Sequence, residues 1–233
     1  MRIHHNIQAM TSQGALYKVN RSMSKSLERL STGLRINRAS DDAAGLGVSE
    51  NLRTQIRGTD QARKNAMDGI AAVNIAEGAA NEVSDILQRM RELAIQSAND
   101  TLTSTERGYT NAEFQDLVQE IDRIAEVTNY NGKKLLSATT GVDRFGQGSA
   151  GSVLWVDANS VVGTDSITVT VATLSASTNG LSVSALALSS QTGAATAISN
   201  LDSAISSVNT MRSDMGAFVN RLEHAINNLT VSN

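Results

Sequence analysis

The sequence predicts a mainly α-helical protein, a long antiparallel rod of coiled-coil type that carries a small β-hairpin or sheet as an appendage. Proline is absent from all 233 residues, so nothing kinks a helix from within. Aromatic residues make up only 3% of the chain, and the 40% hydrophobic content comes mainly from small and aliphatic side chains that suit tight helix seams. Apolar residues also recur at steps of three and four over long stretches, as on one face of a helix.

The first helical pattern lies near the amino terminus. Its apolar positions are Leu16, Val19, Met23, Leu27, Leu30 and Leu34. We therefore expect residues 1–40 to form an amino-terminal helical segment that ends at Gly33. Residues 41–56 are expected to be a connector, because residues 40–47 combine N-cap side chains with glycines.

Residues 57–136 carry the strongest pattern and are predicted to form the amino-terminal helices of a rod domain. One stripe consists of Ala76, Ala79, Val83, Ile86, Met90 and Leu93, and a second row beside it consists of Val73, Ala80, Leu87 and Ala94. After a polar turn at 99–107, a further helix shows Phe114, Leu117, Val118, Ile121, Ile124 and Ala125. It should end at the turn signal of residues 129–132. Two amphipathic helices joined by a short loop predict an antiparallel hairpin.

Residues 137–193 are rich in Ser, Thr, Gly and β-branched side chains and are predicted to be a small variable β region. The alternation at residues 167–171 and again at 181–184 is typical of strands. Residues 194–233 return to a helical heptad pattern interrupted only by Arg212, and we expect a carboxy-terminal rod helix that is cut short, because the pattern is still running at Asn233. The residues predicted to pack the rod are Val83, Ile86, Met90, Leu117, Ile121, Ile205, Val208 and Leu222.

The inventory of reactive side chains argues against an enzyme, a metal site or a cofactor. Cysteine is absent, which excludes disulfides, thiolate metal sites and a cysteine nucleophile. The adjacent His4 and His5 would point about 100° apart on a helix and could not clamp one ion. Asp41 and Asp42 are better explained as a helix-start cap than as a catalytic carboxylate pair. A net charge of −3 without a basic block, and the lack of any long apolar run, predict neither nucleic acid nor membrane as a partner.

Several segments make the sequence similar to the bacterial flagellins. They are MRIHHNI (1–7), LERLSTGLRIN (27–37), DDAAGL (41–46), LQRMRELAIQSAN (87–99), EIDRI (120–124), NGKKLL (131–136) and GAFVNRLE (216–223). The resemblance covers roughly residues 1–137 and 194–232, in family order.

The resemblance implies a subunit of the bacterial flagellar filament, which assembles into a helical tube for motility outside the cell. It implies export by the flagellar type III apparatus without a cleavable signal, and partners that include other flagellin subunits and the hook-associated and cap proteins. It also implies an inner-tube helix at residues 1–40, a spoke at 41–56 and an outer-tube rod beyond. Flagellins carry a further carboxy-terminal helix that pairs with the amino-terminal one. Without it, we expect the amino-terminal helix either to be frayed or to borrow a partner, and we expect no completed filament.

The resemblance further implies recognition by the vertebrate Toll-like receptor for flagellin. The positions that match its contact motif are Gln88, Arg89, Leu93, Gln96 and Glu113. The spacing of Arg89, Leu93 and Gln96 places all three on one helix face. Arg89 and Arg91 should splay to the two sides of Met90 and face solvent.

Three alternative functions remain open at this stage. A hook–filament junction protein of the same superfamily would share the helical ends. A coiled-coil adaptor unrelated to motility would form closed dimers or trimers. A helical-bundle enzyme would need buried carboxylates around a cavity beside Arg212.

Overall fold

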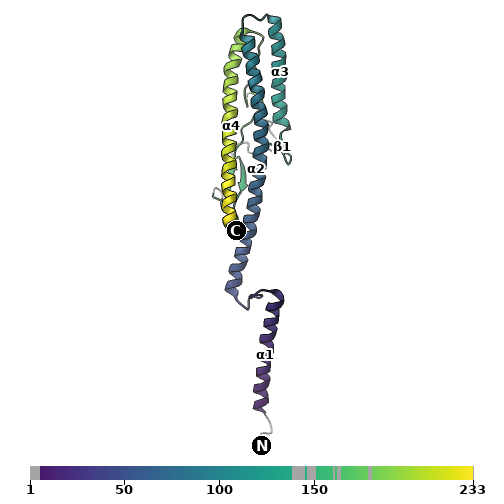
Figure 1. Cartoon of the computed structure of the whole chain (residues 1–233), viewed down its shortest axis with the longest axis vertical. Coiled ribbons are helices and arrows are strands. Elements are labelled where there is room, and N and C mark those ends of the chain that lie inside the picture. The colour runs from purple at the N-terminus through teal and green to yellow at the C-terminus, as the bar shows by residue number, and fades with distance from the viewer. Residues whose placement is uncertain are drawn as a thin grey trace. The chain divides into compact units, whose positions relative to one another are not determined.

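The computed structural model describes residues 6–137, 145, 151–159, 161, 164–177 and 180–232, which fall into two compact units, Met1–Gln55 and Ile56–Asn233. The helices are α1 (Ile7–Thr32), α2 (Ala43–Ala98), α3 (Ser104–Val127) and α4 (Gln191–Ser232) (Figure 1). The strands form two antiparallel pairs, β1 (Asn129–Tyr130) with β2 (Lys133–Lys134) and β3 (Ser152–Trp155) with β4 (Ser166–Val169). The predicted class, a long helical bundle with a small sheet, is confirmed. None of the helices described here has the length and apolar character needed to cross a membrane.

The first unit contains α1, a linker and the start of α2. Helix α1 begins earlier than the apolar pattern indicated, because the side chain of Asn6 accepts a hydrogen bond from the Ala9 amide at 3.1 Å. It ends as predicted at Gly33, whose φ of 69° is the left-handed conformation of a helix C-cap. No residue of α1 is buried.

The prediction of a connector over residues 41–56 is wrong, because α2 already begins at Ala43. Asp42 explains the early start, since its Oδ1 accepts a hydrogen bond from the Gly45 amide at 2.9 Å, as an N-cap does. Gly45 and Gly47 therefore lie inside the helix. The 56 residues of α2 correspond to about 84 Å at 1.5 Å per residue, longer than the sequence pattern alone indicated.

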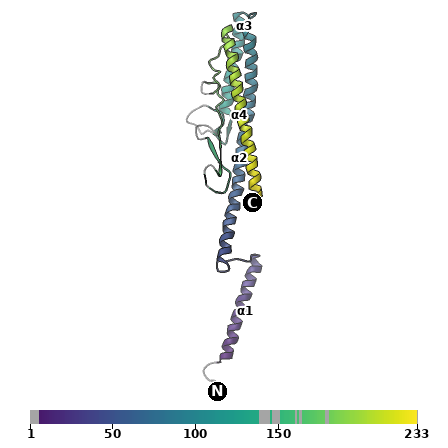
Figure 2. The ribbon, with the colours of Figure 1, turned by 90° about the vertical axis from the view of Figure 1, so that its left-hand side faces the viewer.

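In the second unit, α2 from residue 56 onward lies beside α3 and α4 and forms a rod with them (Figures 1 and 2). One row of buried residues on α2 alternates steps of three and four over its whole length. It consists of Thr59, Ala62, Ala66, Gly69, Val73, Ala76, Ala80, Val83, Leu87, Met90, Ala94 and Ser97. Helix α4 supplies the matching row of Ala194, Ala197, Leu201, Ala204, Val208, Met211, Met215, Leu222 and Leu229. This spacing keeps both rows facing a neighbouring helix, as in a coiled coil.

The residues predicted to pack the rod divide into two groups. Val83, Met90, Ile121, Val208 and Leu222 are buried in the core. Ile86, Leu117 and Ile205 are only partly buried and pack against its edge. Their chain neighbours Leu87, Val118 and Ala204 occupy the central positions instead.

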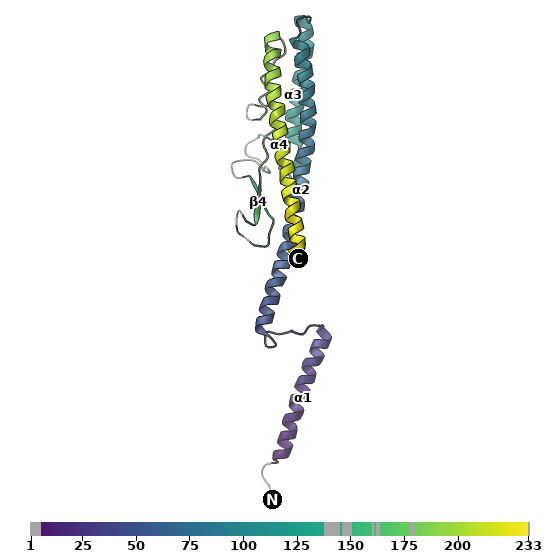
Figure 3. The ribbon, with the colours of Figure 1, turned by 60° about the vertical axis from the view of Figure 1, so that its left-hand side comes forward.

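The turn predicted after the second rod helix is confirmed and forms a short hairpin of β1 and β2. Asn131 and Gly132 have φ values of 50° and 78°, the pair of positive angles that a tight two-residue hairpin turn requires. Figure 3 shows the segment that carries β4 on one side of the helices. Strand β4 confirms the alternation from residue 167, although the strand ends at Val169.

The strand predicted at residues 181–184 is wrong. Ser182 has a φ of 56°, which breaks an extended backbone, and the amides of Leu181 and Val183 donate to the carbonyls of Ser175 and Ala176. The side chains of Leu181 and Val183 are nevertheless buried in the core. Polar side chains of α3 bind the backbone on either side of it. Asn111 accepts from the Leu188 amide, Gln115 donates to the Leu186 carbonyl, and Asp122 accepts from the Ala176 amide, at 2.7–2.8 Å. These side chains satisfy backbone groups that a partner strand would otherwise bind.

Candidate interaction surface on the rod

Arg89 of α2 is the centre of the candidate surface. Its Nε and Nη2 donate to Glu113 Oε1 of α3 at 3.0 and 2.8 Å, and its Nη1 donates to Glu92 Oε2 at 3.0 Å. These contacts raise the pKa of Arg89 above its usual value, with the hydrogen bond to Glu113 as the largest cause and that to Glu92 next. Because the guanidinium side chain is still 51% exposed, it is held in place across two helices and remains open to a partner.

Four of the five predicted receptor-contact positions lie at the surface. Gln88, Arg89 and Gln96 of α2 and Glu113 of α3 are exposed. Leu93 is only 2% exposed and belongs to the hydrophobic core, so it is not part of the exposed surface, and its contact with the receptor stays a prediction. The spacing correctly put Leu93 near Arg89, but an apolar side chain at this position joins the core of the rod. We define the Arg89 face as Gln88, Arg89, Gln96 and Glu113.

Arg91 lies on the other side of Met90, as the helical spacing predicted. Its Nε donates to Asp202 Oδ1 of α4 at 2.7 Å, which raises the pKa of Arg91. Arg89 and Arg91 therefore tie α2 to α3 and to α4, respectively, rather than forming a free solvated flank. Sequence reasoning missed both contacts because the partners lie 24 and 111 residues away.

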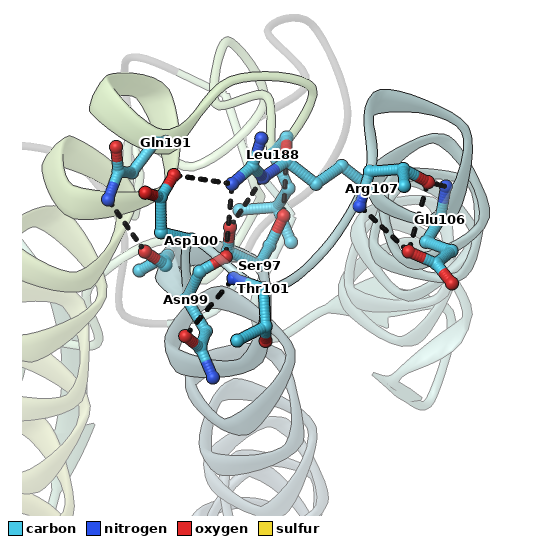
Figure 4. Close-up of polar contacts among 10 residues, drawn as sticks. Ser97, Asn99, Asp100, Thr101, Glu106, Arg107, Leu188 and Gln191 are labelled. Carbon is cyan, nitrogen blue, oxygen red and sulfur yellow. Dashed lines mark hydrogen bonds and ion pairs between the residues drawn. The ribbon is translucent and has the colours of Figure 1, made fainter.

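The tip of the rod is closed by a polar network around Arg107 (Figure 4). Arg107 donates to the carbonyl oxygens of Ser97 and Asn99, both at 3.0 Å. Ser97 Oγ in turn donates to the Leu188 carbonyl at 2.7 Å. Gln191 Nε2 donates to the Ala98 carbonyl at 3.3 Å, so α2, α3 and the start of α4 are joined at one end.

Groups that could support chemistry are sparse along the described chain. No cluster of three or more metal-ligating side chains occurs among the residues that were placed. His4 and His5 lie outside the described residues, and His224 is exposed on α4. The Arg212 side chain has a buried Nε without a hydrogen-bond partner, and no carboxylate forms an ion pair with it within the described ranges.

A rod of long helices with exposed, charge-paired surfaces is typical of a structural protein that interacts through the sides of its helices. Comparison with protein families agrees. Residues 3–140 match the bacterial flagellin N-terminal helical region, and residues 198–233 match the bacterial flagellin C-terminal helical region. The chain belongs to the bacterial flagellin family, and so it is a structural subunit of the flagellar filament. The hypothesis of a coiled-coil adaptor unrelated to motility is thereby wrong.

Curated relatives resemble nearly the whole chain. A flagellin of Halalkalibacterium halodurans is 43% identical over 98% of this chain and 80% of its own length. The flagellar filament 33 kDa core protein of Treponema phagedenis is 41% identical over 100% of this chain and 82% of its own length. A flagellin of Bacillus subtilis is 39% identical over 100% of this chain and 83% of its own length.

Solved structures give a consistent picture of the fold. The crystal structure of Bacillus cereus flagellin has a TM-score of 0.58 and 31% identity, covering 71% of this chain and 88% of that one. A putative flagellar hook-associated protein from Vibrio parahaemolyticus reaches a TM-score of 0.65 over 84% of this chain and 95% of its own. Its identity is only 16%, so it shows a shared fold alone.

Proposed function

We propose that the Arg89 face is a recognition surface for the vertebrate Toll-like receptor for flagellin, in addition to the chain's role as a filament subunit. The observation that carries the proposal is the position of Arg89, which is half exposed yet held by Glu92 on its own helix and Glu113 on the next. Arginine is enriched among the residues that dominate binding energy at protein interfaces.

The geometry of Arg89 suits recognition by a protein partner. Three of its five N–H donors are engaged within the chain, so donors remain for a partner. Because the side chain is already ordered by two carboxylates, less conformational entropy is lost on binding. The exposed amides of Gln88 and Gln96 on the same helix add further donors and acceptors.

We also propose the partners that a filament subunit would bind. Neighbouring subunits would cover the flanks of the rod, so that the free chain rather than the assembled filament is the form the receptor detects. The flagellar export apparatus, the hook-associated proteins and the cap protein are the remaining partners, and the site of action is outside the cell. The family relation supports each of these assignments.

The test compares two arginines on one helix. Arg89→Ala should reduce the potency of the purified chain on receptor-expressing reporter cells by at least about tenfold. Arg91→Ala is the matched control, because Arg91 is also partly exposed and ion-paired but contacts α4 instead of α3. Circular dichroism should show the same helical content in all three proteins. Equal potency of the Arg89→Ala and Arg91→Ala proteins would overturn the proposed surface.

A further inference from the structure

The linker between α1 and α2 folds back along the last turns of α1. Lys25 Nζ lies 2.5 Å from Asp41 Oδ1, and Arg38 Nε donates to Glu28 Oε1 at 2.9 Å. Lys25 and Glu28 are three residues apart and so share one face of α1. Two ion pairs therefore join the same face of one helix to two positions of the linker.

Asp41 is the hub of this arrangement. One of its carboxylate oxygens contacts Lys25, and the other accepts from the Asn37 amide at 3.4 Å. The Asp41 amide donates to the Arg38 carbonyl at 2.9 Å, which closes a turn between the two charged linker residues. The Asp41 side chain is only 12% exposed although it is charged.

The linker is also attached to the start of α2. Asp42 caps that helix through the Gly45 amide. A Cβ on Gly45 would stand 2.5 Å from Asp42 Oδ2 and 3.1 Å from Ile36 Cδ1, so the absence of a side chain at Gly45 leaves room first for the capping carboxylate and then for the linker isoleucine. Helix α1 itself has no buried residue, and two ion pairs connect it to the linker.

We propose that the Lys25–Asp41 and Glu28–Arg38 pairs form an electrostatic clasp that sets the direction of α1 within the amino-terminal unit. The order of charges specifies one alignment. A shift of the linker in one direction would bring Arg38 opposite Lys25, and a shift in the other direction would bring Asp41 opposite Glu28; in either case like charges would repel. The clasp orients α1 before any partner covers its exposed apolar side chains.

The clasp is also releasable. The basic partners Lys25 and Arg38 remain 47% and 72% exposed, and ion pairs that are open to solvent on one side contribute little individually to stability and are screened by salt. Assembly with a partner helix can therefore open both pairs without disrupting α1, which keeps its own backbone hydrogen bonds and caps. The clasp does not depend on the Arg89 face, so its test is independent of receptor recognition.

Because the chain has no cysteine, spin labels can be placed without removing native residues. Labels at Ser12→Cys in α1 and Ser49→Cys in α2, both exposed positions of the first unit, report their separation by pulsed electron paramagnetic resonance. The otherwise unchanged chain should give one narrow distance peak. Lys25→Glu should abolish that peak in favour of a broad distribution, and the exchange Lys25→Glu with Asp41→Lys should restore it.

Lys18→Glu is the matched control, because Lys18 lies seven residues before Lys25 on the same helix and forms no ion pair among the residues described. It should leave the peak unchanged. A broad distribution in the unchanged chain, a narrow one in Lys25→Glu, or failure of the charge exchange to restore the peak would each overturn the clasp. If circular dichroism shows that Lys25→Glu lowers the helical content, the double variant Lys25→Glu with Asp41→Lys still tests the clasp, because it keeps the glutamate at position 25 and restores the opposite charge at position 41.

Discussion

Arg107 of α3 donates from its Nε to the carbonyl oxygen of Ser97, in the last turn of α2, at 3.0 Å. Its Nη2 donates to the Asn99 carbonyl at the same distance. The last carbonyls of a helix have no partner within the helix, so a charged side chain from the next helix satisfies them here. Arg107, at the end of the turn predicted at 99–107, therefore holds α2 and α3 together at the tip of the rod.

Arg107→Ala is expected to lower the free energy of unfolding by roughly 1–3 kcal/mol, because two hydrogen bonds to a charged group are lost at a site where the Arg107 side chain is only 13% exposed. Urea unfolding followed by circular dichroism measures this change. Arg123→Ala is the control on the same helix, because Arg123 pairs within α3, with Glu120, and its side chain is 61% exposed. An equal loss in both variants would contradict the capping role.

Two helical glycines should respond oppositely to alanine. Gly78 has open space around the position of a Cβ, so Gly78→Ala should stabilise the rod by about 1 kcal/mol. A Cβ on Gly58 would lie 2.7 Å from Ala158 Cβ and 3.1 Å from its Cα, so Gly58→Ala should lose that gain and displace the segment next to β3. Thermal unfolding measures stability, and amide hydrogen exchange in residues 152–159 detects the displacement. A similar stabilisation of both variants would contradict this prediction, because it would mean that Ala158 moves away from the new Cβ at no cost in free energy.

Neighbouring core positions should differ in their sensitivity. Leu87 is fully buried, so Leu87→Ala should cost about 2–5 kcal/mol of stability. Ile86→Ala should cost less, since Ile86 is only partly buried at the edge of the core. The same order should hold for the aspartate variants, with Leu87→Asp unfolding the rod more completely than Ile86→Asp. Denaturant midpoints of the four variants decide this, and a greater loss at Ile86 would reverse the assigned packing.

The clasp should depend on pH through Asp41. The hydrogen bond from Lys25 is the largest cause that holds the pKa of Asp41 below its usual value, and the Asn37 amide contributes while burial opposes the shift. A depressed folded-state pKa means that the contribution is fully present above the unfolded value of about 4 and is lost as pH falls through the folded value. The groups that face this carboxylate are Lys25, Asn37 and Arg38, with Glu28 paired to Arg38.

The narrow distance peak between labels at positions 12 and 49 should therefore persist at neutral pH and broaden only in acid, below about pH 4. Asp41→Asn removes the titrating carboxylate, so its distance distribution should already be broad at pH 7 and change less on acidification. A peak that broadens between pH 6 and 8 would contradict the role of Asp41, because Asp41 remains ionised throughout that range.

Much of the fold could be predicted from local patterns. The steps of three and four around Val83 and Val208 identify helices because burial on one side repeats with the helical turn. Gly33 and the pair Asn131-Gly132 mark the end of a helix and a turn because their backbone angles disfavour most other residues. The receptor-contact positions, in contrast, came from the resemblance to flagellins, and the spacing alone placed three of them on one face.

Depth within the rod could not be predicted in the same way. Ile86 and Leu87 are adjacent and similarly apolar, and only the positions of α3 and α4 decide which one is central. The same holds for Leu93, which shares a face with Arg89 but is buried. The alternating residues at 181–184 resemble a strand, yet the positive φ of Ser182 interrupts the extended backbone, and the amides of Leu181 and Val183 bind carbonyls of residues 175 and 176.

The sequence by itself therefore determined the helical class, the main turns and the likeness to flagellins, because these depend on residues close together in the chain. The tertiary structure decided the ion pairs of Arg89 with Glu113, Arg91 with Asp202 and Lys25 with Asp41. Each pair joins residues on different elements. Such a pair forms only after helix packing and turns have brought the two charges within hydrogen-bonding distance, because the attraction between charges falls with their separation.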